Sequence, residues 1–117
     1  MSGIETKRLD LLEHFLDLAA YRQGLVTSNI SNIDTPGYRT RDLDFRQEML
    51  KLVQSPTSSP HPGVQEIQGL MERPDGNNVN LDRESMLLAQ TQLQFRMGIQ
   101  LIKNEFHRVQ MAIEEGK

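Results

Sequence analysis

Two long stretches of the chain, one near each end, repeat apolar residues every three or four positions. In the first stretch the spacing averages about 3.5 residues, which is the period of a left-handed coiled-coil seam. The members of this seam are Leu9, Leu12, Leu16, Ala19, Gln23, Val26, Ile30 and Ile33. A second apolar row, which contains Leu11, Phe15, Leu18 and Leu25, widens the face. The pattern predicts an amphipathic helix.

The last stretch shows the same alternation over a longer distance. Its seam contains Leu81, Ser85, Leu88, Gln92, Phe95, Ile99, Ile102, Phe106, Val109 and Ile113. Asn80 is suited to cap the first turn, and the acidic residues that follow it favour a helix start. The expected fold is all-α, with long terminal helices that pair as an antiparallel coiled-coil-like hairpin. We expect the closest seam contacts from Leu12, Leu16, Val26, Ile30, Leu88, Phe95, Ile99, Ile102 and Phe106.

The middle of the chain has a different character. Four of the five prolines lie between residues 54 and 78, and serine and glycine accompany them. Dense prolines oppose helix, and the small polar residues provide no core. The sequence therefore predicts an N-terminal helical part (1–38), a loop-rich and partly disordered connection (39–79) and a C-terminal helix (80–117).

Apolar residues outside the two seams indicate that a lone hairpin leaves hydrophobic surface in water. They are Leu11, Phe15, Leu25, Met86, Leu93 and Met97. Exposed apolar patches of this kind mark docking surfaces. We therefore expect the helices to contact other molecules as well as each other.

Composition narrows the function. The 117 residues carry a net charge of −3, so the chain lacks the basic surface that nucleic acid requires. No cysteine is present, which excludes disulfides and zinc–thiolate sites. No apolar run is long enough to span a bilayer, and the first residues lack the apolar core of a secretory signal. We expect a soluble chain that does not use the general secretory route.

Candidate chemistry is sparse. Asp10, His14 and Asp17 share one helical face, but two carboxylates and one imidazole make an incomplete ligand set, and a solvated face explains them better. Asp42 and Asp44 resemble a carboxylate pair, yet surface ion pairs to Arg39, Arg41 or Arg46 explain them more simply. We expect no catalytic residue, no metal and no cofactor.

The most specific motif ends the first helix. Pro36 disfavours helix at the residue before it, and Gly37 accepts backbone angles that other residues avoid, so the chain must turn here. Two asparagines lie three residues apart on the last turn, where their amides can bind freed carbonyls or a neighbouring chain. The motif consists of Asn29, Asn32, Thr35, Pro36, Gly37 and Tyr38.

This complete Asn-x-x-Asn-x-x-Thr-Pro-Gly-Tyr run resembles the signature of flagellar axial proteins. The continuation Arg-Thr-Arg-Asp-Leu-Asp-Phe at 39–45 and the run Gly-Asn-Asn-Val-Asn-Leu-Asp-Arg-Glu at 76–84 are similar to proximal subunits of the flagellar basal-body rod protein family. The resemblance covers roughly residues 9–50 and 74–115. It does not inform the Ser/Pro stretch.

The resemblance implies a non-enzymatic subunit that polymerises through its terminal helices, links the inner-membrane ring to the distal rod and transmits torque. It implies export through the flagellar type III apparatus to a periplasmic rod. The implied partners are other rod subunits, the adaptor FliE, the inner-membrane ring and further copies of the chain, with no nucleic acid and no membrane insertion. A soluble helical adaptor or export chaperone of the same system is the alternative.

The segment after the turn alternates arginine and aspartate and carries two apolar anchors, Leu43 and Phe45. Complementary charges of this kind fix the register and partner of a contact. We expect subunit contacts from Arg41, Asp42, Asp44 and Phe45, together with the turn motif. On this interpretation, charge reversal at Arg41 or Asp42 impairs assembly and leaves the yield of monomer unchanged.

Overall fold

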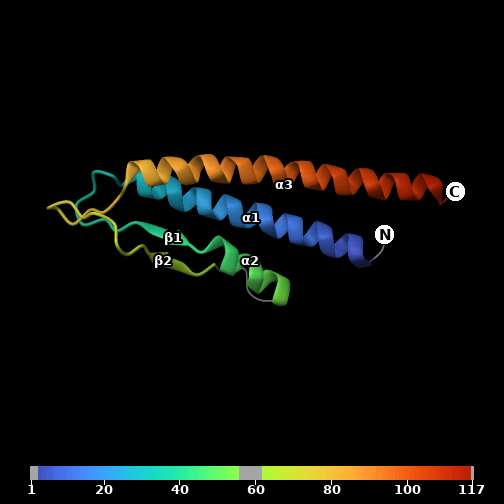
Figure 1. The fold of residues 1–117 in the computed structure, drawn as a ribbon, viewed down its shortest axis with the longest axis horizontal. Helices are drawn as coiled ribbons and strands as arrows, with labels where there is room; N and C mark the ends of the chain where they lie inside the picture. Colours follow the sequence, from blue (N-terminus) through green and yellow to red (C-terminus); the bar gives the residue numbers. More distant parts are fainter. Residues whose placement is uncertain (1–2, 56–61, 117) are drawn as a thin grey trace.

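The computed structural model describes residues 3–55 and 62–116. Two long antiparallel helices, α1 (Gly3–Ser31) and α3 (Leu81–Glu115), form the body of the molecule, and both chain ends lie at the same end of the pair (Figure 1). The molecule measures 69 × 26 × 17 Å, and α3 with its 35 residues accounts for about 50 Å of that length. The predicted pairing of the terminal helices is confirmed. Within the described residues, no helix combines the length and hydrophobicity needed to span a membrane.

The beginning of α3 is the one that the sequence predicts. Asn80 adopts an extended backbone, and its side chain accepts a hydrogen bond from the Arg83 amide at 3.0 Å. This contact satisfies one of the amides that have no partner inside the helix. Asp82 and Glu84 lie in the first turn, where their charge favours the helix dipole.

The connection between the long helices contains more regular structure than the sequence analysis expected. Helix α2 (Phe45–Gln54) and two short strands, β1 (Arg41–Leu43) and β2 (Val64–Glu66), lie within it, so the fold is not purely α-helical. The strands are antiparallel, and Asp42 stands opposite Gln65. Of the predicted Ser/Pro stretch, residues 56–61 lie outside the described part of the chain.

Helix α2 forms because a cap and one aromatic contact support a short amphipathic pattern. The Asp44 side chain accepts a hydrogen bond from the Gln47 amide at 3.0 Å and caps the helix. Phe45 meets Phe15 of α1 edge to face, with ring centroids 5.4 Å apart. This contact fixes the start of α2 against α1, to the right of the strands in Figure 1.

Helix α3 packs on α1 through a row of polar and small residues. Glu84, Thr91, Gly98 and Glu105 are spaced seven residues apart, and all four are buried. At Gly98 the Leu16 side chain of α1 packs directly on the α3 backbone, since a Cβ atom there would lie 2.6 Å from a methyl carbon of Leu16. Leu87 is the buried apolar member of this contact.

The seam expected on α3 therefore differs from the face that packs on α1 within one chain. Ile99 is 46% exposed and Phe106 is 58% exposed, which corrects the expectation that the hairpin shelters them. Leu88, Phe95 and Ile102 are half-buried at the edge of the contact. Helix α3 is rotated about its axis relative to this expectation because Gly98 has no side chain, so Leu16 of α1 fills that position. On α1, Val26 is buried, and Leu12, Leu16 and Ile30 are half-buried.

Candidate functional site

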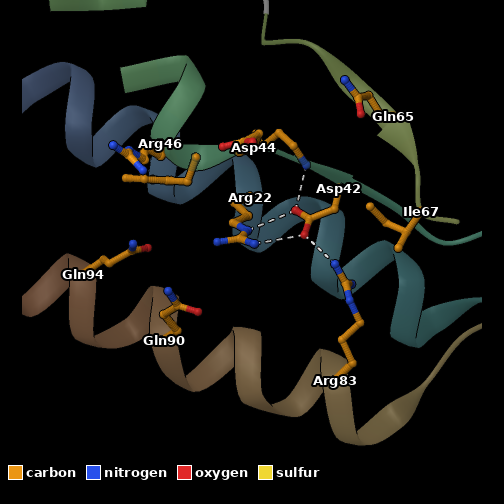
Figure 2. A pocket seen from close by; sticks show the side chains of 11 residues that line it. Arg22, Asp42, Asp44, Arg46, Gln65, Ile67, Arg83, Gln90 and Gln94 are labelled. Atoms are coloured by element: carbon orange, nitrogen blue, oxygen red, sulfur yellow. Dashed lines mark hydrogen bonds and ion pairs between the residues drawn. The ribbon is translucent and has the colours of Figure 1, made fainter. Parts of the chain in front are cut away.

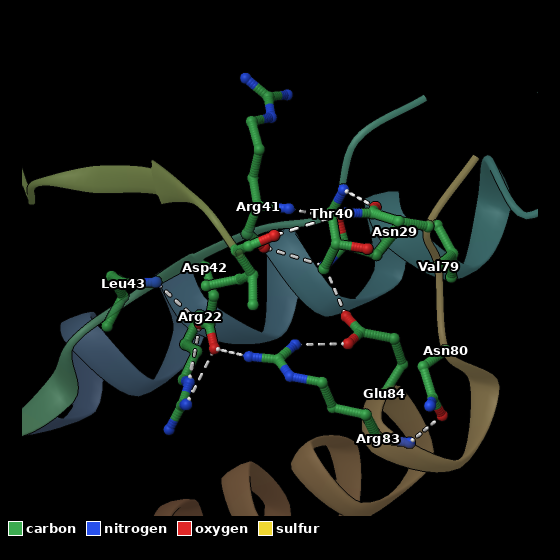
Figure 3. Close-up of polar contacts among 12 residues, drawn as sticks. Arg22, Asn29, Thr40, Arg41, Asp42, Leu43, Val79, Asn80, Arg83 and Glu84 are labelled. Carbon is green, nitrogen blue, oxygen red and sulfur yellow. Dashed lines mark hydrogen bonds and ion pairs between the residues drawn. The ribbon is translucent and has the colours of Figure 1, made fainter. Parts of the chain in front are cut away.

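Buried polar and charged side chains gather where the turn after α1 meets the start of α3. We call this group, formed by Arg22, Asn29, Asp42, Arg83 and Glu84, the polar clamp. Its residues come from α1, β1 and the first turn of α3, and they point toward one another (Figure 3). The clamp brings together positions as much as 62 residues apart in the sequence.

Asn29 is the centre of the clamp and is 1% exposed. Its amide nitrogen donates to the Arg41 carbonyl at 2.9 Å and to a carboxylate oxygen of Glu84. Its amide oxygen accepts from the Arg41 amide at 3.2 Å and from the Tyr38 hydroxyl at 2.9 Å. The Asn29 side chain thus forms the same pair of hydrogen bonds with the Arg41 backbone that a neighbouring strand would form. It lies along the edge of β1 that β2 leaves open.

The carboxylates of Asp42 and Glu84 are balanced by two arginines. Arg22 grips Asp42 with two parallel hydrogen bonds, each 3.0 Å long. Arg83 bridges the two carboxylates, reaching Asp42 at 2.8 Å and Glu84 at 2.7 Å. Glu84 is completely buried, so its contacts with Arg83 and the Asn29 amide offset the cost of removing the carboxylate from water.

Burial and the neighbouring hydrogen-bond donors shift the pKa of Asp42 in opposite directions. Burial disfavours the charged form and by itself raises the pKa of the carboxyl. The hydrogen bond and charge of Arg22, with further bonds from the Leu43 amide and Arg83, outweigh burial. The pKa of Asp42 therefore lies below its usual value, and the group is charged at neutral pH.

An asparagine pair secures the turn beside the clamp. Asn77 donates to the carbonyls of Asn32 and Thr35, each at 2.9 Å, and closes the end of α1. Asn78 accepts from the Thr40 amide at 2.7 Å and holds the chain that leads into β1. These bonds join the two connections at the closed end of the hairpin.

Gly37 and Gly76 make the closest backbone approach of the turn. Both have positive φ, 75° and 89°, which favours glycine. A Cβ atom on Gly76 would lie 3.4 Å from the Cα atom of Gly37, and the Gly37 amide donates to the Asp75 carbonyl at 2.8 Å. The motif glycine, Gly37, is therefore favoured by its own positive φ, since a Cβ atom there would meet nothing within 4 Å, whereas Gly76 combines a positive φ with the close approach.

An open hollow of about 550 Å³ lies beside the clamp, between α3 and the beginning of α2. Arg22 and Asp42 line it, and Gln90 and Gln94 reach toward it from α3 (Figure 2). Four hydrogen bonds engage the Asp42 carboxylate, so this group is not available as a base. The hollow has the polar lining of a contact surface and lacks a free nucleophile–base pair.

Several residues expected to contact other subunits also make contacts within the chain, and their subunit contacts stay predictions. Asp42 is 3% exposed and pairs with Arg22 and Arg83, so the expectation of surface ion pairs to Arg39, Arg41 or Arg46 is wrong for this residue. Reversal of the Asp42 charge would place a cation against two arginines. We therefore expect this change to lower the yield of monomer, in place of the unchanged yield expected from the sequence. Asp44 caps α2, and Phe45 packs on Phe15.

The exposed members of the turn motif are Thr35, Pro36 and Gly37. Asn32 and Tyr38 are half-buried, and the Asn32 amide donates to the Ser28 carbonyl at 2.8 Å. Arg41 is exposed on β1, and within the described residues its side chain forms no ion pair. A subunit contact through Arg41 stays a prediction.

Sequence reasoning missed Arg22, Arg83 and Glu84 as members of the clamp. Their partners are 20 to 55 residues away, and local spacing carries no sign of such pairs. One signal was present. The first turn of α3 has charged residues at 82, 83 and 84, and one of them must face α1 in any packed hairpin.

No protein-family model matches the chain. Among curated proteins, it is 32% identical to the flagellar basal body rod protein FlgB of Escherichia coli K12 over 86% of this chain and 88% of that protein. It is 31% identical to FlgB of Salmonella typhimurium over 93% of this chain and 97% of that protein. FlgB of Bacillus subtilis is 28% identical over 91% and 92%.

These relatives are flagellar basal body rod proteins, and they place the chain, with its paired terminal helices, in the flagellar rod class. Within that class the identity and coverage are sufficient for a specific assignment. The chain belongs to the FlgB family of flagellar basal body rod proteins.

Proposed function

We propose that the chain is a structural subunit of the proximal rod of the bacterial flagellum, which polymerises through its terminal helices. The observation that carries this proposal is the amount of apolar surface that α3 leaves uncovered. A helix that is apolar on several sides is stable in water only when other surfaces cover those sides.

Three rows with seven-residue spacing run along α3. The row from Glu84 to Glu105 packs on α1, as described above. A second row contains Ile99, Phe106 and Ile113, which are 46%, 58% and 62% exposed. A third, on the far side of the helix, contains Met86 and Leu93, with Met97 beside it. Two separate apolar rows fit contacts with two neighbouring molecules.

The turn supports this role indirectly. Its hydrogen bonds are made within the chain and fix α1 and α3 relative to each other, so each copy offers the same outer surface. Identical copies that join through different faces build an open helical polymer unless the rotation closes. The family membership agrees with such an assembly.

The finer assignments follow from the same proposal. The subunit lies in the basal body, links the inner-membrane ring to the distal rod and transmits torque for motility. Its partners are other rod subunits, the adaptor FliE, the inner-membrane ring and further copies of itself. It reaches the periplasm through the flagellar type III apparatus.

The test uses the outer rows of α3. Phe106→Ser and Met97→Ser remove apolar surface that the isolated chain leaves exposed, so the stability of the monomer changes by less than about 0.5 kcal/mol. We expect loss of motility, and basal bodies without a rod, when these variants replace the natural chain. Gln100→Ser, at an exposed polar position of the same helix, is the matched control.

Electron microscopy of isolated basal bodies separates the two candidate roles. A rod subunit is retained in the purified basal body in many copies. An adaptor or export chaperone stays in the cytoplasm and leaves the rod free of the chain. Full motility of both serine variants would contradict the proposed use of α3.

A further inference from the structure

The outer faces of α1 and α3 carry exposed charges of opposite sign that find no partner within one chain. Asp10 and Asp17 lie on α1, and Arg96 and Lys103 lie on α3; all four are exposed. No ion pair joins any of them to another residue in the described ranges. The two acidic residues are seven positions apart, as are the two basic residues, so each pair forms a stripe along one face.

The axial positions of these charges match. Within the chain, Arg8 of α1 pairs with Glu105 of α3 at 3.5 Å, which defines one level of the antiparallel helices. Two residues further along α1 stands Asp10, and two residues back along α3 stands Lys103. These two residues therefore share a level, although they lie on faces that do not meet inside one molecule.

The next heptads repeat the match. Asp17 and Arg96 share the level seven residues beyond, where the charges again have opposite sign. Seven residues further, Gly24 of α1 shares a level with Ala89 of α3, and both are exposed. Space around Gly24 is open, since a Cβ atom there would meet nothing within 4 Å. Two small residues at one level allow the helix backbones to approach closely.

We infer that α1 of one copy packs on α3 of a second copy at the same axial level that the two helices keep within one chain. This contact places Asp10 against Lys103, Asp17 against Arg96, and Gly24 against Ala89. A shift by one heptad in either direction leaves only one of the two ion pairs. The inference rests on the proposed polymerisation and specifies its lateral neighbour.

The charges select the register, and apolar surface supplies the affinity. Exposed ion pairs contribute little free energy, since much of their attraction is lost to solvent and side-chain ordering. Complementary charges instead exclude wrong alignments. Beside Arg96 on α3, Leu93 and Met97 are 64% and 53% exposed, and Tyr21 of α1 is 45% exposed. Burial of these side chains drives the contact.

Cysteine cross-linking tests the inference directly, because the chain contains no cysteine of its own. Gly24→Cys and Ala89→Cys are expressed as two separate chains in cells that lack the natural copy, so a cross-link between them is intermolecular. The matched control combines Ser31→Cys with Ala89→Cys, which places the thiols one heptad out of register. We expect at least about tenfold more cross-linked dimer from the first pair in isolated basal bodies.

Charge reversal gives a second readout. In the Gly24→Cys and Ala89→Cys background, the double change Arg96→Glu and Lys103→Glu reduces the cross-linked dimer by about tenfold, because both pairs become repulsive. The additional changes Asp10→Lys and Asp17→Arg restore it. Recovery by this charge swap distinguishes direct pairing from a general loss of folding.

The outcomes separate this inference from the function on which it rests. If the cysteine chains enter the basal body and the in-register pair cross-links no better than the control, the lateral contact is overturned and the rod function stands. If the natural chain itself is absent from purified basal bodies, the rod function fails and the contact fails with it.

Discussion

The closed end of the molecule and the outer faces of α3 differ in which side chains they remove from water. At the closed end, polar groups such as Asn29 and Glu84 are removed from water and joined by hydrogen bonds within the chain. Along the outer faces of α3, apolar groups such as Phe106 and Leu93 are left in water. The comparison teaches that the closed end buries its polar groups within a single copy, whereas on the proposed function α3 is completed by neighbours.

This contrast explains why the asparagines of the turn motif form their hydrogen bonds within the chain. Asn29 supplies both its donor and its acceptor to Arg41, and Asn77 closes the end of α1. A buried network stays favourable only when every member is satisfied, so the motif residues are interdependent. They set the direction in which each helix leaves the turn, and the proposed rod contacts depend on that direction.

The largest expected effect is at Glu84. Glu84→Ala leaves Arg83 without one partner and removes the acceptor of the Asn29 amide in a completely buried site. We expect a loss of about 3–5 kcal/mol in the free energy of unfolding, measured by urea titration. Asp82→Ala changes the exposed acidic residue of the same turn and is the control. A loss below about 1 kcal/mol at Glu84 would show that the clamp adds little to stability.

A smaller effect distinguishes the two helix glycines. Gly24→Ala adds a methyl group to open space and gains helix propensity, so it stabilises the monomer by up to about 1 kcal/mol. Gly98→Ala gains the same propensity but presses on Leu16, and we expect a net loss of about 1 kcal/mol. Thermal unfolding of the pair measures the difference. Equal stabilisation by both changes would contradict the close approach at Gly98.

The third effect is confined to acid pH. The folded-state pKa of Asp42 lies below its unfolded value, so its contribution to stability is present above the unfolded pKa, near 4, and is lost as pH falls through the folded pKa. Asp42→Asn removes this contribution and flattens the acid limb of stability against pH. An unchanged acid limb in urea titrations from pH 6 to pH 2 would contradict the lowered pKa.

Local signals in the sequence were sufficient for the two long helices, the Asn80 cap and the turn at Pro36 and Gly37. Each depends on residues within a few positions of one another. The short strands were missed because three-residue elements carry no measurable period. Helix α2 was missed because its pattern covers only ten residues and borders the proline-rich stretch.

The face of α3 that packs on α1 could not be predicted from the sequence, for a different reason. This helix carries apolar residues on several sides, so periodicity alone does not show which side pairs within the chain. The close contact of Gly98 with Leu16 determines which face of α3 packs on α1, and that contact joins residues far apart in sequence. The burial of Asp42 was hidden in the same way, because its partners Arg22 and Arg83 come from other elements.

Hydrogen exchange of α3, compared between the purified monomer and isolated basal bodies, tests the central claim most directly. The first turns of α3, held by Glu84, should be protected in both states, since their partners come from the same chain. Amides from Ile99 to Ile113 should exchange rapidly in the monomer and become protected in the basal body, where neighbours cover the outer rows. Equal protection of this second half in both states would mean that α3 needs no neighbour, and would contradict the account.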